Sequence, residues 1–294
     1  LSGFSPNSTK IHCDIDPSSV NKNVQVDLAV IGDATKILEA LIAEMKSRKF
    51  TPHKPSLDKW WAQIEAWRGR ECLKFNQTGE IIKPQHAIKR LCEMTSDRDV
   101  YITTEVGQHQ MWAAQYFDFH LPNRWMTSGG LGTMGYGLPA ALGVQVGHNN
   151  ATVIDIAGEA SFMMNMQELS TLAQYNLPVK MFIINNEWMG MVRQWQELIH
   201  GGRYSESYSA SLPDFVKLAE TFNMKGLVAQ KADDLDSVIT EMLETPGPVI
   251  ADIRVAKEEN CFPMIPSGAT HNDMLLGPED QAEKPVSEEG MVLV

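Results

Sequence analysis

Residues 153–190 constrain the fold more than any other stretch of the chain. Residues 153–157 form a short run that is mostly apolar and rich in β-branched side chains, as in a buried strand, and residues 179–184 form a second apolar run. Between them, Asn165 precedes Glu168 by three residues, a variant of the capping box that predicts a helix beginning there. Strand, helix and strand within about thirty residues predict a βαβ unit with parallel strands.

Each strand of this unit is followed by a polar residue, Glu159 after the first and Asn186 after the second. Ligands of open α/β sheets bind beyond the carboxyl ends of parallel strands, so we expect both side chains to face one crevice. A carboxylate and an amide oxygen suit Mg²⁺ or Ca²⁺, and Mg²⁺ takes its other ligands from phosphates and water. The alternative is that Glu159 only caps a helix and that Asn186 lies in an ordinary turn.

Composition excludes several classes of function. The 294 residues, 43% of them hydrophobic, can bury a sizeable core in one large domain or one and a half. A net charge of −12 disfavours nucleic acid or an anionic membrane as partner, and no apolar run approaches the ~18 residues of a membrane span. The 4 cysteines have neither disulfide nor zinc spacing, which fits a cytoplasmic protein. The chain begins at Leu1 rather than Met, and we expect a fragment.

The first part of the chain resembles the end of a second α/β domain. Strands are expected at residues 10–17 and 26–31, each with acidic residues at its end, and a helix at residues 34–45. An acidic residue after a strand often binds the ribose of a nucleotide, although surface turns use Asp just as freely. Residues 46–82 are polar and contain a tryptophan-rich helix, so we interpret them as a connector.

Helices and strands alternate regularly in residues 83–257, which predicts a doubly wound parallel sheet. Helices are expected at residues 84–94, 138–146, 212–222 and 233–245, and further strands at 100–104, 226–229 and 248–255. Residues 258–294 are irregular and acidic and are expected to form a carboxyl-terminal tail.

Two further turns are predicted at the same sheet edge. Gly107 permits a tight turn, and the helix that follows offers free N–H groups beside Gln108 and His109, as in an anion site. A histidine that only caps a helix is the alternative. The glycine-rich residues 128–137 indicate that the backbone approaches something bulky, either a bound ring system or a packed helix. Together these turns favour a phosphate and metal site.

Longer runs of sequence resemble a known family. Residues 158–186 are similar to the signature of thiamine diphosphate enzymes, in which Gly-Asp-Gly or Gly-Asp-Ala precedes Asn-Asn by some two dozen residues. Residues 106–115, 127–139, 191–195 and 263–268 closely resemble acetohydroxyacid synthases, also called acetolactate synthases, in their catalytic large subunit. The similarity covers nearly the whole chain.

Carried over residue by residue, the resemblance implies a Mg²⁺ site made of Glu159, the Asn186 side chain and the Trp188 backbone carbonyl. It also implies a thiamine diphosphate site, in which the phosphates bind Gln108 and His109 and the bent cofactor lies on Met134 and Gly132. The phosphate pocket would be completed by Ala160, Ser161, Glu187, Met189, Gly190 and Met191. Trp195 and Ser267 match the substrate channel, and the end of the family's FAD-binding middle domain is matched by Asp14, Ile15, Asp33 and Ala34.

The implied reaction joins two pyruvates, or pyruvate and 2-ketobutyrate, with loss of CO₂, in the biosynthesis of branched-chain amino acids. FAD is structural in the family, and the active site forms between two subunits, so a homodimer or tetramer is expected. The resemblance leaves open whether a small regulatory subunit binds. It equally leaves pyruvate oxidase, glyoxylate carboligase and a non-catalytic cofactor-binding fragment as alternatives.

The chain departs from the family pattern in two respects. Glu159 stands where the motif has Asp, and its extra methylene must shift the metal or the turn. The family's amino-terminal domain, which supplies the glutamate that activates thiamine, is absent from these residues. We therefore expect no catalytic acid or base here and no activity from the isolated chain.

Overall fold

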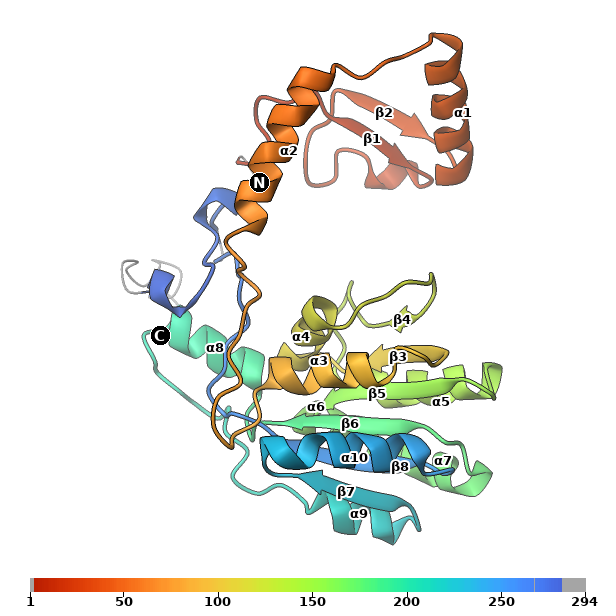
Figure 1. The fold of residues 1–294 in the computed structure, drawn as a ribbon, viewed down its shortest axis with the longest axis vertical. Helices are drawn as coiled ribbons and strands as arrows, with labels where there is room; N and C mark the ends of the chain where they lie inside the picture. The colour runs from red at the N-terminus through yellow and green to blue at the C-terminus, as the bar shows by residue number, and fades with distance from the viewer. Residues whose placement is uncertain (1–2, 267, 282–294) are drawn as a thin grey trace. The chain divides into compact units, whose positions relative to one another are not determined.

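The computed structural model describes residues 3–266 and 268–281. Contacts divide the chain into two compact units, one joining Leu1–Cys72 to Phe262–Ala282 and the other containing Leu73–Cys261. The polypeptide therefore leaves the smaller unit near residue 72 and returns to it near residue 262 (Figure 1).

The larger unit contains a six-stranded, fully parallel sheet with strand order β4-β3-β5-β6-β8-β7 (Figure 1). The strands are β3 (Val100–Thr104), β4 (Trp125–Met126), β5 (Thr152–Gly158), β6 (Lys180–Asn185), β7 (Lys225–Ala229) and β8 (Val249–Arg254). Because β3 pairs with β5 on one side and β6 with β8 on the other, the chain order reverses across the sheet, as in a doubly wound fold. The predicted fold class is confirmed.

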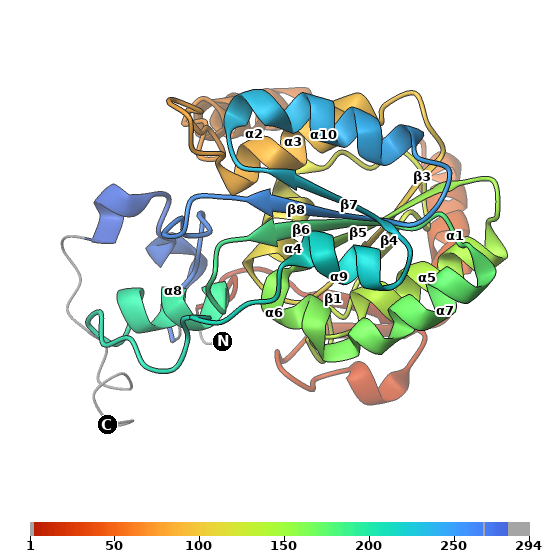
Figure 2. The ribbon, with the colours of Figure 1, turned by 90° about the horizontal axis from the view of Figure 1, so that it is seen from below.

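Helices cover both faces of this sheet (Figure 2). One face packs against α3 (Pro84–Met94), α4 (Gln108–Tyr116) and α10 (Ala232–Glu244), whose apolar side chains form one buried cluster with Ile154, Ile156 and Phe182. The other packs against α5 (Gly137–Gly147), α6 (Glu159–Phe162), α7 (Leu169–Tyr175) and α9 (Phe215–Thr221), around Val153 and Ile183. Neighbouring residues of β5 thus enter opposite cores, which explains why its sequence is mostly apolar, with Asp155 as a fully buried exception.

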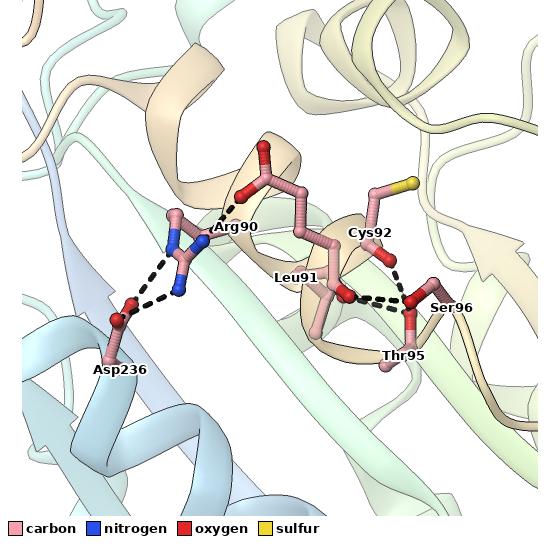
Figure 3. A network of polar contacts seen from close by, with 7 residues as sticks. Arg90, Leu91, Cys92, Thr95, Ser96 and Asp236 are labelled. Carbon is pink, nitrogen blue, oxygen red and sulfur yellow. Dashed lines mark hydrogen bonds and ion pairs between the residues drawn. The ribbon is translucent and has the colours of Figure 1, made fainter.

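An ion pair joins the two helices that cover one face of the sheet. Arg90 on α3 donates from Nε and Nη2 to the two Asp236 oxygens on α10, at 3.0 and 2.8 Å (Figure 3). Thr95 ends α3 by donating its hydroxyl to the Leu91 carbonyl at 2.8 Å. This bidentate pair links α3 to α10 at the surface, above the apolar cluster that the two helices share.

The predicted capping box at Asn165 is wrong. The helical segment begins directly after β5, at Glu159, and continues through the 3-10 helix η2 (Met163–Glu168) into α7. Asn165 lies inside η2 at a kink, with φ −132° and ψ 29°, and its Nδ2 donates to the Gly135 carbonyl at 2.5 Å. The side chain therefore anchors the glycine-rich loop instead of a helix start, a contact between residues far apart in sequence.

The smaller unit begins with a parallel pair of strands, β1 (Ile11–Asp14) and β2 (Leu28–Ile31), followed by α1 (Ala34–Ser47). Its helix α2 (Lys54–Arg68) carries the tryptophans, of which Trp60 and Trp67 meet edge to face. The 3-10 helix η1 (Pro17–Ser19) lies between β1 and β2, and two more, η3 (His271–Asp273) and η4 (Pro278–Gln281), lie in the later part of the unit. Among the described residues, no helix has the length and apolar content needed to cross a membrane.

The central strand β6 should carry much of the stability of the larger unit. Phe182 is fully buried in β6, so Phe182→Ala is expected to lower the free energy of unfolding by about 3–5 kcal/mol. Tyr175 is 64% exposed, and Tyr175→Ala should change it by less than about 0.5 kcal/mol. Urea unfolding of both variants measures the difference; equal effects would show that this core is not the stabilising one.

Candidate cofactor and metal site

A cleft opens at the carboxyl ends of β3, β5 and β6. Its position follows from the parallel register, in which Gly158 at the end of β5 lies beside Ile184 of β6. Most of the predicted cofactor residues line it, namely Gln108, His109, Met134, Glu159, Ala160, Ser161, Asn186, Trp188, Met189, Gly190 and Met191. The sheet thus brings together residues that are more than eighty positions apart in sequence.

Glu159 is buried in the cleft without a full set of partners. The residue is 1% exposed, and its Oε1 has no hydrogen-bond partner. Burial raises the pKa of Glu159 to about 8, although its own backbone N–H and that of Asn186 oppose the shift by binding the carboxylate. A cation beside Oε1 would favour the ionised carboxylate, so the site fits a divalent metal.

Asn186 follows β6 and is 5% exposed. Its Oδ1 accepts a hydrogen bond from the Trp188 N–H at 3.1 Å, and its Nδ2 donates to Gln108 Oε1 at 3.3 Å. An amide oxygen has two lone pairs, so Oδ1 can still bind a cation. The side chain therefore offers a second hard oxygen ligand next to Glu159.

The loop after Asn186 is held by a second segment of chain. The Met189 N–H donates to the Ser207 carbonyl and the Ser209 N–H to the Glu187 carbonyl, both at 2.8 Å. Glu187 adopts a left-handed backbone with φ 62°, which turns the chain before Trp188. This pairing fixes the backbone from which the Trp188 carbonyl was predicted to bind the metal.

His109 contributes an unpaired ring nitrogen at the start of α4. It is 6% exposed, and its Nε2 has no hydrogen-bond partner. Burial lowers the pKa of His109 to about 3, so the ring is neutral at ordinary pH. Gly158 permits this position, because a Cβ there would lie 2.7 Å from His109 Nδ1.

The glycine-rich loop reaches the cleft through Met134. Its far end is tied to Glu105, whose carboxylate accepts the Gly135 and Leu138 N–H groups at 2.6 and 3.1 Å. Burial raises the pKa of Glu105, and these hydrogen bonds oppose the shift. No sequence pattern indicated a role for Glu105, although it follows β3 directly and lies at the same sheet edge as Gly107.

Several predicted site residues lie outside this cleft. Gly132 and Glu187 are not among its lining residues, and the Glu187 carboxylate accepts from the Tyr208 hydroxyl at 2.8 Å and from Lys257. Trp195, in α8 (Gly190–Leu198), is 42% exposed. Ser267 lies outside the described residues.

The residues predicted to contact FAD belong to the smaller unit. Asp14 ends β1, Ile15 follows it, and Asp33 and Ala34 begin α1 after β2. Asp33 caps α1 by accepting the Lys36 N–H at 3.2 Å, and Asp14 accepts the Asp16 N–H at 2.8 Å. Because β1 and β2 are parallel, the two acidic residues lie at the same edge of their sheet.

No cluster of three or more His, Cys, Asp or Glu side chains suited to a metal occurs in residues 3–266 and 268–281. A metal in the cleft would thus rely on a single carboxylate, an amide and a backbone carbonyl. That donor set leaves coordination positions for phosphate oxygens and water, as Mg²⁺ prefers.

Glu159 should make the metal-free protein less stable as pH rises. Its pKa is about 8 in the folded chain and 4.5 for an unperturbed glutamate, so the folded chain holds an extra proton between these values. Unfolding releases that proton, and the free energy of unfolding should fall by up to about 1.4 kcal/mol per pH unit between pH 5 and 8.

Urea unfolding across pH 5–8 without divalent ions checks this expectation. Glu159→Gln should flatten the slope, whereas Glu244→Gln, an exposed change at the end of α10, should leave it as it is. An unchanged slope in Glu159→Gln would mean that Glu159 ionises normally in the folded chain.

Comparison with known proteins agrees with the geometry. Acetolactate synthase isozyme 3 large subunit of Escherichia coli (strain K12) is 45% identical over 281 residues, which are 94% of this chain and 48% of that protein. The acetolactate synthase large subunits of Haemophilus influenzae and Porphyra purpurea are 40% and 42% identical, also over 94% of this chain and over 48% and 46% of their own lengths. The chain spans about half the length of these curated relatives.

The family model "Thiamine pyrophosphate enzyme, C-terminal TPP binding domain" matches residues 105–253. This range begins at Glu105, includes β5, β6 and the lining residues of the cleft, and ends in β8. The match covers half of the chain, and the chain belongs to the thiamine pyrophosphate enzymes.

Proposed function

We propose that this chain is part of an acetolactate synthase large subunit that condenses two pyruvates, or pyruvate with 2-ketobutyrate, releasing CO₂. The observation that carries the proposal is the buried Glu159 carboxylate, with its unpartnered Oε1, beside Asn186 in the cleft. Relatives that are 40–45% identical and are named acetolactate synthase support the choice of reaction. The activity is proposed for the whole protein, because the chain spans 48% of those relatives.

Within the cleft, Glu159, the Asn186 amide oxygen and the Trp188 carbonyl would hold Mg²⁺. Glu159 lies in the first turn of α6, and its extra methylene, compared with Asp, would be absorbed by a shift of the metal or of that turn. When bound, thiamine diphosphate supplies a ring that stabilises a carbanion, which allows carbon–carbon bonds to break and form. The protein's part is to bind, orient and exclude water.

The diphosphate would lie between α4 and the start of α6. An anion there would raise the pKa of His109, and its protonated Nε2 would then donate to a phosphate oxygen. Ser161 directs its hydroxyl to the Gly158 carbonyl at 3.1 Å, so its contribution to the pocket would come mainly from its backbone N–H. Met134, which also lines the cleft, would support the cofactor ring.

FAD, subunit partners and location complete the proposal. FAD would bind near Asp14 and Asp33, which end parallel strands of the smaller unit. A homodimer or tetramer, with a small regulatory subunit as a further partner, follows from the same resemblance. All four cysteines are free, which supports a cytoplasmic location.

The alternatives differ in their products. A pyruvate oxidase type of enzyme would use the same metal site but would form peroxide from pyruvate, and a glyoxylate carboligase type would prefer glyoxylate. A binding fragment without catalysis would bind the cofactor and turn over nothing. The identity to acetolactate synthases favours acetolactate formation over these alternatives.

Calorimetry tests the site directly. We expect thiamine diphosphate to bind the chain only when Mg²⁺ is present, and Glu159→Ala to weaken this binding by at least tenfold because it removes the only charged ligand. Glu244→Ala is the matched control at an exposed carboxylate. Binding that is independent of Mg²⁺, or unaffected by Glu159→Ala, would contradict the proposed metal site.

A fusion tests the reaction. The part of the Escherichia coli isozyme 3 large subunit that precedes its matched region is joined to this chain, and pyruvate consumption is followed. Acetolactate is the expected product, and its loss in Glu159→Ala ties turnover to the cleft. Peroxide instead of acetolactate would favour the oxidase alternative.

A further inference from the structure

We propose that Gln194 is a positioning residue for the metal site: through Gln108, it sets which end of the Asn186 amide faces the metal. The inference rests on the proposed function, because it concerns the ligand that Asn186 would provide. Gln194 is 0% exposed and lies in α8, away from the cleft lining. No role for it follows from the sequence signature of the metal site.

The chain of amides starts at a backbone whose donor and acceptor cannot be exchanged. The Cys261 N–H donates to Gln194 Oε1 at 2.8 Å, and Gln194 Nε2 donates to the Cys261 carbonyl at 3.2 Å. A flipped Gln194 amide would set donor against donor and acceptor against acceptor. The Cys261 backbone therefore fixes the orientation of Gln194.

Gln194 in turn fixes Gln108. Gln108 Nε2 donates to Gln194 Oε1 at 2.8 Å and to the Glu259 carbonyl at 3.0 Å. Both acceptors require the nitrogen of Gln108 on that side, so Oε1 must point the other way. The amide of Gln108, which is 3% exposed, is thus committed to neighbours within the protein, so its predicted contact with the phosphates would come from its backbone N–H.

Gln108 finally fixes Asn186. Gln108 Oε1 accepts from Asn186 Nδ2 at 3.3 Å, and the Trp188 N–H donates to Asn186 Oδ1 at 3.1 Å. Reversal of the Asn186 amide would place oxygen against Gln108 Oε1 and nitrogen against the Trp188 N–H. The oxygen of Asn186 is consequently held on the side of the Trp188 N–H, and this oxygen is the atom that a cation in the cleft would need.

Gly190 makes room for this chain of amides. A Cβ at position 190 would collide with Gln108 Oε1 and would lie 3.0 Å from Asn186 Nδ2. Gly190 also begins α8, the helix that carries Gln194. The absence of a side chain there allows Gln108 and Asn186 to meet.

The test measures Mg²⁺ affinity by calorimetry in saturating thiamine diphosphate. Gln194→Met, which has similar volume but no amide, should weaken Mg²⁺ binding by about 10–100-fold, as loss of an outer ligand support does. Gln145→Met is the matched control: Gln145 is 1% exposed and donates to the His148 and Ala151 carbonyls at the far end of α5. It should lower the unfolding midpoint without changing Mg²⁺ affinity.

Repeating the measurement in the Asn186→Asp variant separates an effect on the orientation of the Asn186 amide from a general loss of stability. In Asn186→Asp both side-chain oxygens can bind the metal, so no amide orientation has to be set. The carboxylate would instead oppose Gln108 Oε1, and removing Gln194 would free Gln108 to rotate. The double variant Asn186→Asp/Gln194→Met should therefore bind Mg²⁺ with an affinity within about threefold of that of Asn186→Asp alone, or more tightly. In the chain that keeps Asn186, by contrast, Gln194→Met should weaken Mg²⁺ binding.

The outcomes are distinct. Equal losses in both backgrounds, or no loss from Gln194→Met with Asn186 present, would overturn the role of Gln194 and leave the proposed function standing. Failure of the unaltered chain to bind Mg²⁺ with thiamine diphosphate would overturn both.

Discussion

The parallel pairing of β5 with β6 is the constraint on which the rest of the structure depends. Because of this pairing the two strands end next to each other. Glu159 and Asn186, which follow the strands, therefore lie at the same edge of the sheet. The other lining residues of the cleft come mainly from α4, from the turns before and after this pair, and from the loop after Asn186. A slip in register would separate the two oxygen ligands by several ångströms.

The cleft is built at a cost to stability. Glu159 Oε1 and His109 Nε2 are buried without partners, and each such atom typically costs about 1–3 kcal/mol. Apolar cores on both sides of the sheet provide the stability that tolerates this cost. Glu159 and His109 line the same cleft. A bound metal would pair with Glu159 Oε1, and a diphosphate oxygen would accept a hydrogen bond from His109 Nε2.

Periodicity and turn residues predicted much of the fold. The helix at residues 84–94 and the strand at residues 100–104 were predicted with the bounds that the structure shows, and the other predicted strands of the large sheet differ by one residue at one or both ends. Asn165 was misread because its side chain bonds to Gly135, a partner thirty positions away that no local pattern contains. Trp125–Met126 was not predicted, since a two-residue strand carries no periodicity.

The sequence by itself determined the strand–helix alternation and the polar residues that follow the strands, because both are local properties of residue type and spacing. Tertiary structure decided which of those residues meet. It turned Glu187 toward Tyr208 and Lys257, tied Glu105 to the glycine-rich loop, and placed Gln194 behind Gln108. Such contacts join residues distant in sequence, and their geometry arises only when helices pack on the completed sheet.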